Sequence, residues 1–328
     1  MHALVITEKN RPIVVQERAA LKADKGTAIV KIYAAALNHR DVWIQKGLYA
    51  GLKYPIIPGS DGAGVVVSGP EEWVGKEVII NPSIGWGSHA THQDQQTFEI
   101  LGLPDDGTFA EYVKVPAANL FEKPEHLSFE EAAALPLAGV TAYRALFVRA
   151  QLRAKEKVLI TGIGGGVAVS ALKFAVAAGA RVYVTSGNDE KIARAIAMGA
   201  RAGVNYKNAG WVETLQETGG FDITLDGAAG DGMKALLNLA CPGGRLVFYG
   251  STQGNPTGLE ARRIFWKQLN ILGSTMGSPD DFSAMIGFVN KHGIRPVIDK
   301  IFPFADGEAA FRRMENAQQF GKIVLKIH

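Results

Sequence analysis

Residues 157–198 read KVLITGIGGGVAVSALKFAVAAGARVYVTSGNDEKIARAIAM, and this stretch decides the fold. It opens with a short apolar run, 158–161, which meets a cluster of glycines and then an amphipathic segment, 167–178. A strand, a tight turn and a helix follow from that order. After the next glycine come a second β-branched run, 181–185, and helical spacing over 188–198. The stretch therefore predicts a β-α-β-α unit.

The glycines of the turn are the residues expected to bind a dinucleotide phosphate. They let the backbone approach a pyrophosphate closely, while the free N–H groups at the helix start supply hydrogen-bond donors. Two registers of the G-x-G-x-x-G/A pattern are open, one through Gly162, Gly164 and Val167 and the other through Gly162, Gly165 and Ala168. The second is preferred because it keeps a small residue where helix and strand meet. The cofactor-binding residues expected from the turn are Gly162, Gly164, Gly165, Gly166 and Val167.

Length, composition and net charge limit the kinds of protein that this chain can be. A chain of 328 residues exceeds what one hydrophobic core ordinarily serves, so two domains are expected. Hydrophobic residues make up 47% and charged residues 20%, which argues against disorder over most of the chain. The net charge of +3 is small and no basic run of five or more occurs, so nucleic acid is not an expected partner.

Cysteine content and the N-terminus predict a cytoplasmic protein. The one cysteine, Cys241, excludes an intramolecular disulfide and a multi-cysteine metal site, which suits a reducing compartment. The N-terminus, MHALVITEKNRP, has neither the basic nor the apolar region of a signal peptide. No apolar run reaches the length of a membrane span, so neither export nor a membrane partner is expected.

The first third of the chain predicts a compact β-barrel-like domain. Short Val- and Ile-rich runs alternate there with glycine and proline turns; the expected strands are 3–7, 27–35, 62–68, 77–81 and 109–116. Between the later strands lies a polar insertion, 83–106, which we expect to form a surface lobe.

The rest of the chain alternates between strands and helices. Residues 128–148 begin with a capping box of Ser128 and Glu131 and predict a buried helix pair that links the domains. The strands expected after residue 198 are 202–206, 221–226, 245–250 and 271–275. Such alternation predicts a doubly wound parallel sheet. The tail from residue 280 is expected to end in a strand, 322–327, that returns to the N-terminal domain.

The end of the second strand of the βα unit favours NADP(H) over NAD. NAD-binding folds place an acidic residue there to accept from the ribose 2′-OH, but residues 185–188 read TSGN. Lys191, one turn into the next helix, and Tyr206, at the end of the third strand, are expected to donate to a 2′-phosphate. Asp189 lies close enough to weaken this argument, although its place at a helix start suits an N-cap.

Six motifs in order resemble the medium-chain dehydrogenase/reductase superfamily. They are AAALNHRDVWIQKG, YPIIPGSDGAGVV, DGTFAEYV, AAALPLAGVTAYRAL, the glycine turn and the terminal GKIVL. The resemblance covers essentially the whole chain and implies an α/β protein with two domains. These are a GroES-like β-barrel catalytic domain, 1–125 and 263–328, and a Rossmann dinucleotide-binding domain, 126–262. It also implies assembly as a homodimer or a homotetramer.

The resemblance also shows what this chain lacks. Zinc alcohol dehydrogenases of that superfamily bind a catalytic zinc through a cysteine, a histidine and a second cysteine, and the matching positions here hold Asn38, Ser60 and Leu137. Zinc requires a tetrahedral shell of thiolate, imidazole or carboxylate ligands, which an amide, a hydroxyl and an isobutyl group cannot provide. We therefore predict no catalytic metal site.

The lobe at 83–106 occupies the place where zinc members carry a four-cysteine structural site. The matching positions are approximately Trp86, His89, His92 and Ile100. Two histidines at i and i+3 without a carboxylate or thiolate partner make a poor structural metal site. We interpret them as surface loop histidines, while the retained lobe suggests kinship with the zinc-type branch.

Zinc-free members of the superfamily are similar to quinone and enone reductases, in which side chains steady the substrate oxygen that becomes negative. Asn38 suits that role, because its amide can donate to a substrate oxygen. Tyr49, in KGLYAGLKYP, matches a pocket tyrosine of this branch and could donate likewise. His39 is a third catalytic candidate. The alternative interpretation is that it is a surface histidine without a catalytic role. Asp41 is expected to bond the local backbone.

Further cofactor contacts are expected from helix and loop residues around the Rossmann sheet. Thr141 is expected to lie against the nicotinamide or its phosphate, and the loops after the late strands follow carboxyl ends of parallel strands, where ligands bind. The residues expected in the cofactor site beyond the turn are Thr141, Ser186, Lys191, Tyr206, Gly250, Ser251, Thr252, Thr275 and Lys322.

The hypothesis from sequence is an NADPH-dependent oxidoreductase without catalytic zinc that transfers hydride to a small-molecule substrate, a quinone or an α,β-unsaturated carbonyl. Two alternatives stay open. One is an alcohol or aldehyde dehydrogenase of the zinc-type branch, which the lobe favours. The other is a non-catalytic NADPH-binding sensor, which would bind the dinucleotide without consuming it.

Overall fold

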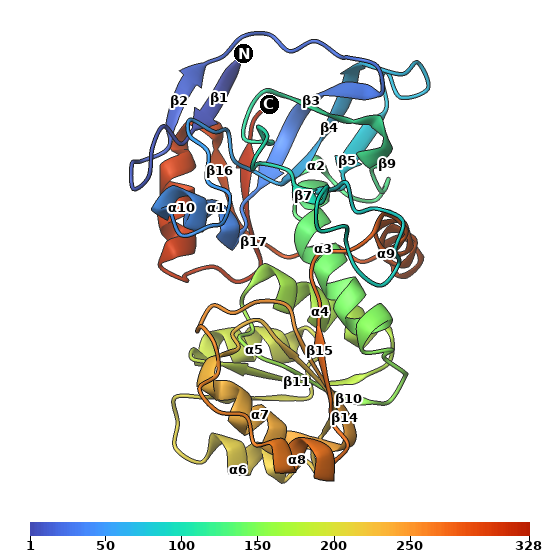
Figure 1. The fold of residues 1–328 in the computed structure, drawn as a ribbon, viewed down its shortest axis with the longest axis vertical. Helices are drawn as coiled ribbons and strands as arrows, with labels where there is room; N and C mark the ends of the chain where they lie inside the picture. Colours follow the sequence, from blue (N-terminus) through green and yellow to red (C-terminus); the bar gives the residue numbers. More distant parts are fainter. The chain divides into compact units, whose positions relative to one another are not determined.

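Six parallel strands form the centre of Thr141–Met276, one of the two units into which residues 1–328 of the computed structural model divide (Figure 1). The sheet order is β12-β11-β10-β13-β14-β15, and every neighbouring pair runs parallel. The strands are β10 (Lys157–Ile160), β11 (Arg181–Ser186), β12 (Ala202–Asn205), β13 (Phe221–Asp226), β14 (Ala240–Phe248) and β15 (Asn270–Gly273). The strand order reverses between β10 and β13, so the predicted doubly wound sheet is confirmed.

Helices connect these strands on both sides of the sheet. They are α4 (Gly166–Ala177), α5 (Asp189–Ala197), α6 (Trp211–Gln216), α7 (Met233–Leu239) and α8 (Ala261–Trp266). In Figure 1, α4 and α5 lie on one side of the strands, and α6, α7 and α8 lie together on the other. Because both faces are covered, the central strands are apolar runs rather than alternating ones, as in the buried residues 158–160 of β10.

The other unit, Met1–Val140 with Gly277–His328, is built around a seven-stranded mixed sheet in the order β16-β17-β3-β4-β5-β9, with β8 paired to β3. Its strands are β3 (Thr27–Ala36), β4 (Asp61–Ser68), β5 (Glu77–Ile80), β8 (Tyr112–Pro116), β9 (Leu120–Glu122), β16 (Ile298–Pro303) and β17 (Lys322–Lys326). Two small antiparallel pairs accompany it: β1 (His2–Val5) with β2 (Val14–Glu17), and β6 (Ser83–Ile84) with β7 (Glu99–Ile100). The last strand, β17, pairs with β3, so its predicted return to the N-terminal strands is confirmed.

The helices of this unit are α1 (His39–Lys46), α2 (Phe129–Ala133), α3 (Pro136–Tyr143), α9 (Pro279–His292) and α10 (Gly307–Glu315), and a π-helical segment, Arg144–Arg149, continues α3. Three of these helices, α1, α2 and α9, begin at a capping box. At α2 the Glu131 N–H donates to Ser128 Oγ (3.2 Å) and the Ser128 N–H donates to Glu131 Oε2 (3.0 Å), which is the predicted capping box. Short 3₁₀ turns lie at Ala117–Asn119, Gly230–Gly232 and Phe304–Asp306.

The two units meet along the chain at residues 140/141 and 276/277, whereas the sequence analysis places the boundaries at 125/126 and 262/263. Two contacts explain the observed positions. The Phe129 ring of α2 stacks on the Tyr33 ring of β3 with the ring centroids 4.6 Å apart, which holds α2 on the seven-stranded sheet. Strand β15 pairs with β14, which keeps residues 270–273 in the six-stranded sheet.

No helix of the structure is both long enough and apolar enough to cross a membrane.

Candidate functional site

The glycine turn between β10 and α4 has backbone angles that only glycine adopts readily. Gly162 has φ 62° and Gly164 has φ 132°, while Gly165 is the N-cap of α4 with φ −72°. A side-chain carbon added at Gly162 or Gly165 would meet no atom within 4 Å, so the space beside both residues is open. The first N–H groups of α4 have no acceptor within the helix. The turn therefore offers backbone donors to a phosphate, with open space beside Gly162 and Gly165.

A buried carboxylate holds the strand that leads into the turn. Asp226, at the end of β13, accepts from Thr161 Oγ1 (2.5 Å) through Oδ1 and from the Ala229 N–H (2.6 Å) through Oδ2. Its side chain is buried. The sequence analysis missed this residue, although an aspartate that ends an apolar strand at the sheet's carboxyl edge was a signal that could have revealed it.

The end of β11 is where the ribose side of a dinucleotide is expected, and cationic residues lie near it. A carbon added at Gly187 would lie 2.8 Å from Tyr206 Oη and 2.8 Å from Lys207 Cε, so both side chains lie against this glycine. Lys191 reaches back over the turn, because a carbon added at Gly164 would lie 2.8 Å from its Cδ and 3.3 Å from its Nζ. Lys207 is a cation that the sequence analysis passed over.

Asn188 and Asp189 make different hydrogen bonds at the start of α5. Asn188 Oδ1 accepts from the Lys191 N–H (3.0 Å), so Asn188 is the cap. The Asp189 carboxylate accepts from Asn205 Nδ2 (3.0 Å), which engages it with the neighbouring strand. Ser186, buried at the end of β11, accepts from the Asn188 N–H (3.3 Å) through Oγ.

The remaining cofactor candidates of this unit lie in loops and at a helix. Gly250 packs closely on the loop after β13, since an added carbon would lie 2.8 Å from the Gly227 carbonyl oxygen. Ser251 and Thr252 follow it, with the Thr252 N–H 3.5 Å from the same carbonyl. Thr141 is buried in α3 with Oγ1 4.0 Å from Met276 Sδ, while Thr275 is exposed after β15. The structure thus places Gly250–Thr252 and Thr275 after the carboxyl ends of β14 and β15.

In the other unit, Asn38, Asp61 and Lys322 meet in a buried cluster, which we call the amide cluster. The sheet register brings them together: Ala36 of β3 pairs with Asp61 of β4 and with Val324 of β17. Asn38 Nδ2 donates to Asp61 Oδ2 (2.9 Å), and Lys322 Nζ donates to Asn38 Oδ1 (2.7 Å) and to Asp61 Oδ2 (2.8 Å). Lys322, expected at the cofactor, is therefore held against the predicted catalytic amide.

The three positions that match zinc ligands have other partners. Asn38 belongs to the amide cluster, Ser60 Oγ accepts from Arg40 Nη1 (2.7 Å), and the Leu137 N–H donates to Asp61 Oδ1 (2.7 Å). No group of three or more histidine, cysteine, aspartate or glutamate side chains is arranged to hold a metal ion.

Arg40 ties Tyr49 to the same region. Its guanidinium lies over the Tyr49 ring at 5.0 Å from the centroid, and its Nε lies 3.4 Å from the phenolic oxygen. Nη1 also donates to the Leu101 carbonyl (2.8 Å), which fixes the guanidinium. His39, by contrast, is exposed, with its ring 6.2 Å from that of Trp43. Arg40 therefore joins Tyr49 to Ser60, which directly precedes Asp61 of the amide cluster, whereas His39 is exposed.

Asp41 fixes the backbone that carries the amide. Its Oδ2 accepts from the Asn38 N–H (2.8 Å) and its Oδ1 from the Gly59 N–H (3.3 Å), which confirms the expected bond to the local backbone. Burial raises the pKa of Asp41 from 3.8 to about 6, although the nearby Arg40 charge, the bond from Asn38 and the Lys322 charge oppose this shift.

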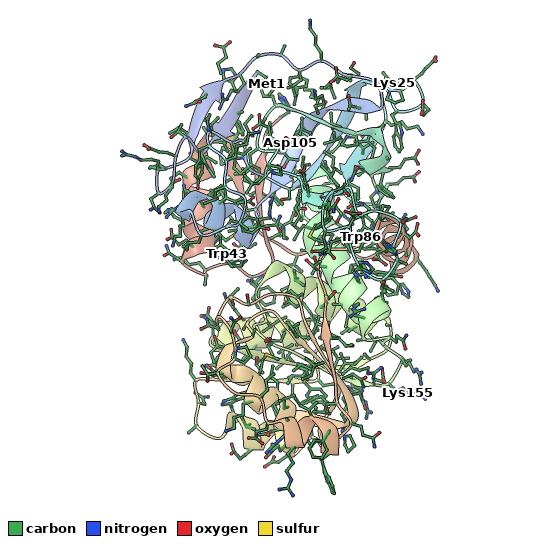
Figure 2. All side chains as sticks on the ribbon, viewed as in Figure 1. Met1, Lys25, Trp43, Trp86, Asp105 and Lys155 are labelled. Atoms are coloured by element: carbon green, nitrogen blue, oxygen red, sulfur yellow. The ribbon has the colours of Figure 1, made fainter.

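The lobe at 83–106 is organised by Trp86 (Figure 2), which is 3% exposed. Trp86 Nε1 donates to the His89 carbonyl (2.9 Å), and its ring meets Phe98 edge-on at 5.5 Å. His89 and His92 are exposed, with stacked rings 4.6 Å apart, and Ile100 lies in β7.

Family models match both parts of the chain. The alcohol dehydrogenase GroES-like domain matches residues 24–125, and the zinc-binding dehydrogenase model matches residues 166–291. The zinc-type alcohol dehydrogenase-like protein YogA of Leptosphaeria maculans is 36% identical over 323 residues, which cover 91% of this chain and 90% of that protein.

Solved structures resemble the whole chain. An NAD-dependent alcohol dehydrogenase superposes with a TM-score of 0.94 at 35% identity, covering 100% of both chains. The quinone oxidoreductase from Thermus thermophilus, solved also in complex with NADPH, superposes with a TM-score of 0.82 at 30% identity, again over 100% of both.

Proposed function

Since this chain belongs to the medium-chain dehydrogenase/reductase superfamily and is an oxidoreductase with a fold that binds nicotinamide dinucleotides, we propose that it is an NADPH-dependent reductase of quinones or α,β-unsaturated carbonyls that uses no catalytic metal. The observation that carries the proposal is the amide cluster. At the positions that match zinc ligands, the chain has an amide bonded to a lysine ammonium and an aspartate.

The glycine turn supports the dinucleotide part of the proposal. The open space beside Gly162 and Gly165 fits a pyrophosphate, and the start of α4 supplies the donors. When bound, the reduced dinucleotide would supply a hydride, which is a proton with two electrons. In this assignment the chain's own residues bind and orient it: Gly162 and Gly164–Val167 through the backbone, and Thr141, Ser186, Gly250, Ser251, Thr252 and Thr275 along the edges of the site.

The preference for NADPH rests on charge at the end of β11. Lys207 and Tyr206 lie against Gly187, and Lys191 crosses the turn at Gly164. Asp189, the acid that could favour a ribose hydroxyl, is engaged by Asn205. Two ammonium groups and a phenol suit the two negative charges of a 2′-phosphate.

The side chains at the three matching positions do not suit a catalytic zinc ion. An amide, a hydroxyl and a hydrocarbon do not make a zinc shell. The Lys322 ammonium already compensates the buried Asp61 carboxylate, so a second cation there would meet electrostatic repulsion. The histidines of the lobe, His89 and His92, lack a third ligand, and we propose no metal there either.

The amide cluster and Tyr49 offer hydrogen-bond donors, which suit a carbonyl oxygen that is being reduced. They suit an alcohol substrate less well, because an alcohol must lose its proton to be oxidised. One of the two side-chain N–H groups of Asn38 donates to Asp61, so the second can donate to a ligand. Tyr49 presents a hydroxyl that Arg40 orients. Both can donate to an oxygen that gains negative charge during reduction. We propose Asn38 and Tyr49 as catalytic residues, and His39 as a residue at the margin of the substrate site.

We also propose that the chain assembles with itself, as a homodimer or homotetramer. Strand β15 is the last in the order of the six-stranded sheet, so one of its edges has no neighbouring strand. In the preceding helix, α8, Phe265 is 65% exposed and Trp266 is 78% exposed. A second copy would cover both features by the same contacts on each side of a two-fold axis.

The direct test of the proposed function is turnover. Purified chain is incubated with NADPH and a panel of quinones and α,β-unsaturated ketones, and separately with NADP⁺ or NAD⁺ and a panel of alcohols. We expect NADPH consumption with at least one acceptor and little alcohol oxidation. Efficient alcohol oxidation would instead support the zinc-type dehydrogenase alternative, and dinucleotide binding without consumption would support a sensor.

A further inference from the structure

The amide of Asn38 has only one orientation that its buried partners allow. Its oxygen receives the Lys322 ammonium at 2.7 Å and its nitrogen faces the Asp61 carboxylate at 2.9 Å. If the amide were turned over, its NH₂ would face the ammonium and its oxygen the carboxylate. Both contacts would then be repulsive, and in a buried site neither group could turn to water.

The cluster is buried, so its charges interact strongly. Asp61 is 0% exposed, Lys322 is 3% exposed and Asn38 is 8% exposed. Both oxygens of the carboxylate are engaged, because Oδ1 accepts from the Leu137 N–H and Oδ2 accepts from Asn38 and Lys322. The charges of Asp61 and Lys322 balance each other within the cluster.

Counting donors shows what remains for a ligand. An amide nitrogen carries two hydrogens, and one of those on Asn38 is used by Asp61. The ammonium bonded to the amide oxygen withdraws electrons through the amide, which strengthens the remaining N–H as a donor. The Asn38 backbone is also fixed, because its N–H donates to Asp41 at the start of α1.

We propose that Lys322 and Asp61 are positioning residues that act through Asn38: they fix the orientation of the amide and polarise it, so that its second N–H donates to the substrate oxygen that becomes negative. This inference rests on the proposed function. In the reduction of an enone, hydride from NADPH forms a C–H bond at the β-carbon. The C=C electrons then form a double bond between the α-carbon and the carbonyl carbon, and the C=O π electrons move to the oxygen. The resulting enolate takes a proton from water at the α-carbon, which gives the saturated ketone.

In this role Lys322 acts on the substrate side and does not bind the dinucleotide. An ammonium committed to Asn38 and Asp61 should influence kcat, whereas a lysine that bound a cofactor phosphate should influence the dissociation constant of NADPH. The two roles therefore predict different measurements on the same variant.

The test is a double-mutant cycle of Asn38→Leu and Lys322→Met, read by kcat, by the Kd of NADPH from fluorescence titration and by Tm. Lys326→Met, at the exposed end of the same strand, is the matched control. Because Lys322→Met leaves the Asp61 carboxylate without its cation, the charge-neutral pair Lys322→Met with Asp61→Asn is measured beside it.

Removing one donor to a developing oxyanion costs about 10²–10³ in kcat, so we expect a loss of that order for Asn38→Leu. We expect a loss of about tenfold or more for Lys322→Met and for the charge-neutral pair, with the Kd of NADPH within about twofold of wild type. The Asn38→Leu/Lys322→Met double variant should lose no more than Asn38→Leu alone, because the lysine acts through the amide.

Three outcomes would overturn this assignment while leaving the proposed function intact. They are an unchanged kcat in the charge-neutral pair, independent and multiplicative losses in the cycle, or a raised Kd for NADPH in the Lys322 variants. A wild-type chain that consumes no NADPH with any acceptor would instead overturn the proposed function itself. The Tm values would then still show whether Asn38 and Lys322 are coupled in the fold.

Discussion

Two groups of side chains are expected to determine the choice of cofactor and the orientation of the buried Asn38 amide. Lys191, Tyr206 and Lys207 lie around the turn and the end of β11, where Lys191 is half-buried and the other two are exposed. Asn38, Asp61 and Lys322, by contrast, are buried where three strands meet. The first group can be changed with little effect on stability, and the second cannot.

We expect Lys207→Ala and Lys191→Ala each to raise the Kd of NADPH about tenfold or more, because each removes a charged donor to the 2′-phosphate, worth about 1.5–3 kcal/mol. The Kd of NADH should change by less than about twofold. Fluorescence titration with both dinucleotides measures this. Lys234→Ala, an exposed lysine of α7, is the control and should change neither value. Equal losses for NADPH and NADH would contradict the assignment.

Asp41 makes stability depend on pH. Its pKa is raised to about 6 in the folded chain, so the folded state holds a proton that the unfolded state has released between pH 3.8 and 6. Stability therefore falls as pH rises through this window, by about 1.4 kcal/mol per pH unit and about 3 kcal/mol in all.

An Asp41→Asn variant lacks this titration. Urea unfolding of both proteins at several pH values should show wild type losing stability relative to the variant between about pH 4 and 6, with a constant difference above that window. A difference between the two proteins that stays constant from pH 4 to 7 would show that Asp41 is not protonated in the fold.

The turn between β10 and α4 is the element on which dinucleotide binding depends. Gly165 has φ −72°, which alanine adopts without strain, and open space lies beside it. Gly165→Ala should therefore change the free energy of unfolding by less than about 1 kcal/mol. It should nevertheless raise the Kd of both NADPH and NADH about tenfold or more, because the methyl group enters the space of the pyrophosphate.

The control is Gly287→Ala, in the middle of α9, where an added carbon also meets nothing within 4 Å. It should stabilise the chain by about 0.5–1 kcal/mol and leave dinucleotide binding unchanged. Normal binding by Gly165→Ala would show that the phosphates do not lie against this glycine.

Elements with a strong local signal could be predicted from sequence. The β-branched run, the glycines and the amphipathic segment of 157–198 fix β10, the turn, α4, β11 and α5 in order, because each depends on neighbours along the chain. The capping box at Ser128 is likewise a contact over three residues. Small strands such as β2 and β9 were not predicted, because their pairing partners, and not their own residues, define them.

The amide cluster could be predicted only in part. Asn38 was identified by its position in a motif, but the pairing of Asn38 with Lys322 spans 284 residues and depends on the register of β3, β4 and β17. Asp61 gave no signal of its own beside Ser60. Lys207 was missed because its approach to Gly187 depends on the path of the chain after β12.

The whole molecule should behave as an assembly of identical chains. A Phe265→Ser/Trp266→Ser variant removes the two most exposed aromatic side chains of α8, so it should shift the mass measured by light scattering toward that of the 35.1 kDa monomer. Ile301→Ser, an exposed apolar residue of β16, is the control and should keep the wild-type mass. A monomeric wild type would contradict the proposed assembly.

The central claim is that this chain reduces a polarised acceptor with NADPH and without a metal. The most direct measurement is the rate of NADPH oxidation with an α,β-unsaturated ketone or a quinone, by enzyme dialysed against a strong chelator, before and after zinc is added back. The account predicts that the rate survives chelation, does not rise with zinc, and exceeds the rate with NADH. A rate that is lost on chelation and restored by zinc would contradict it.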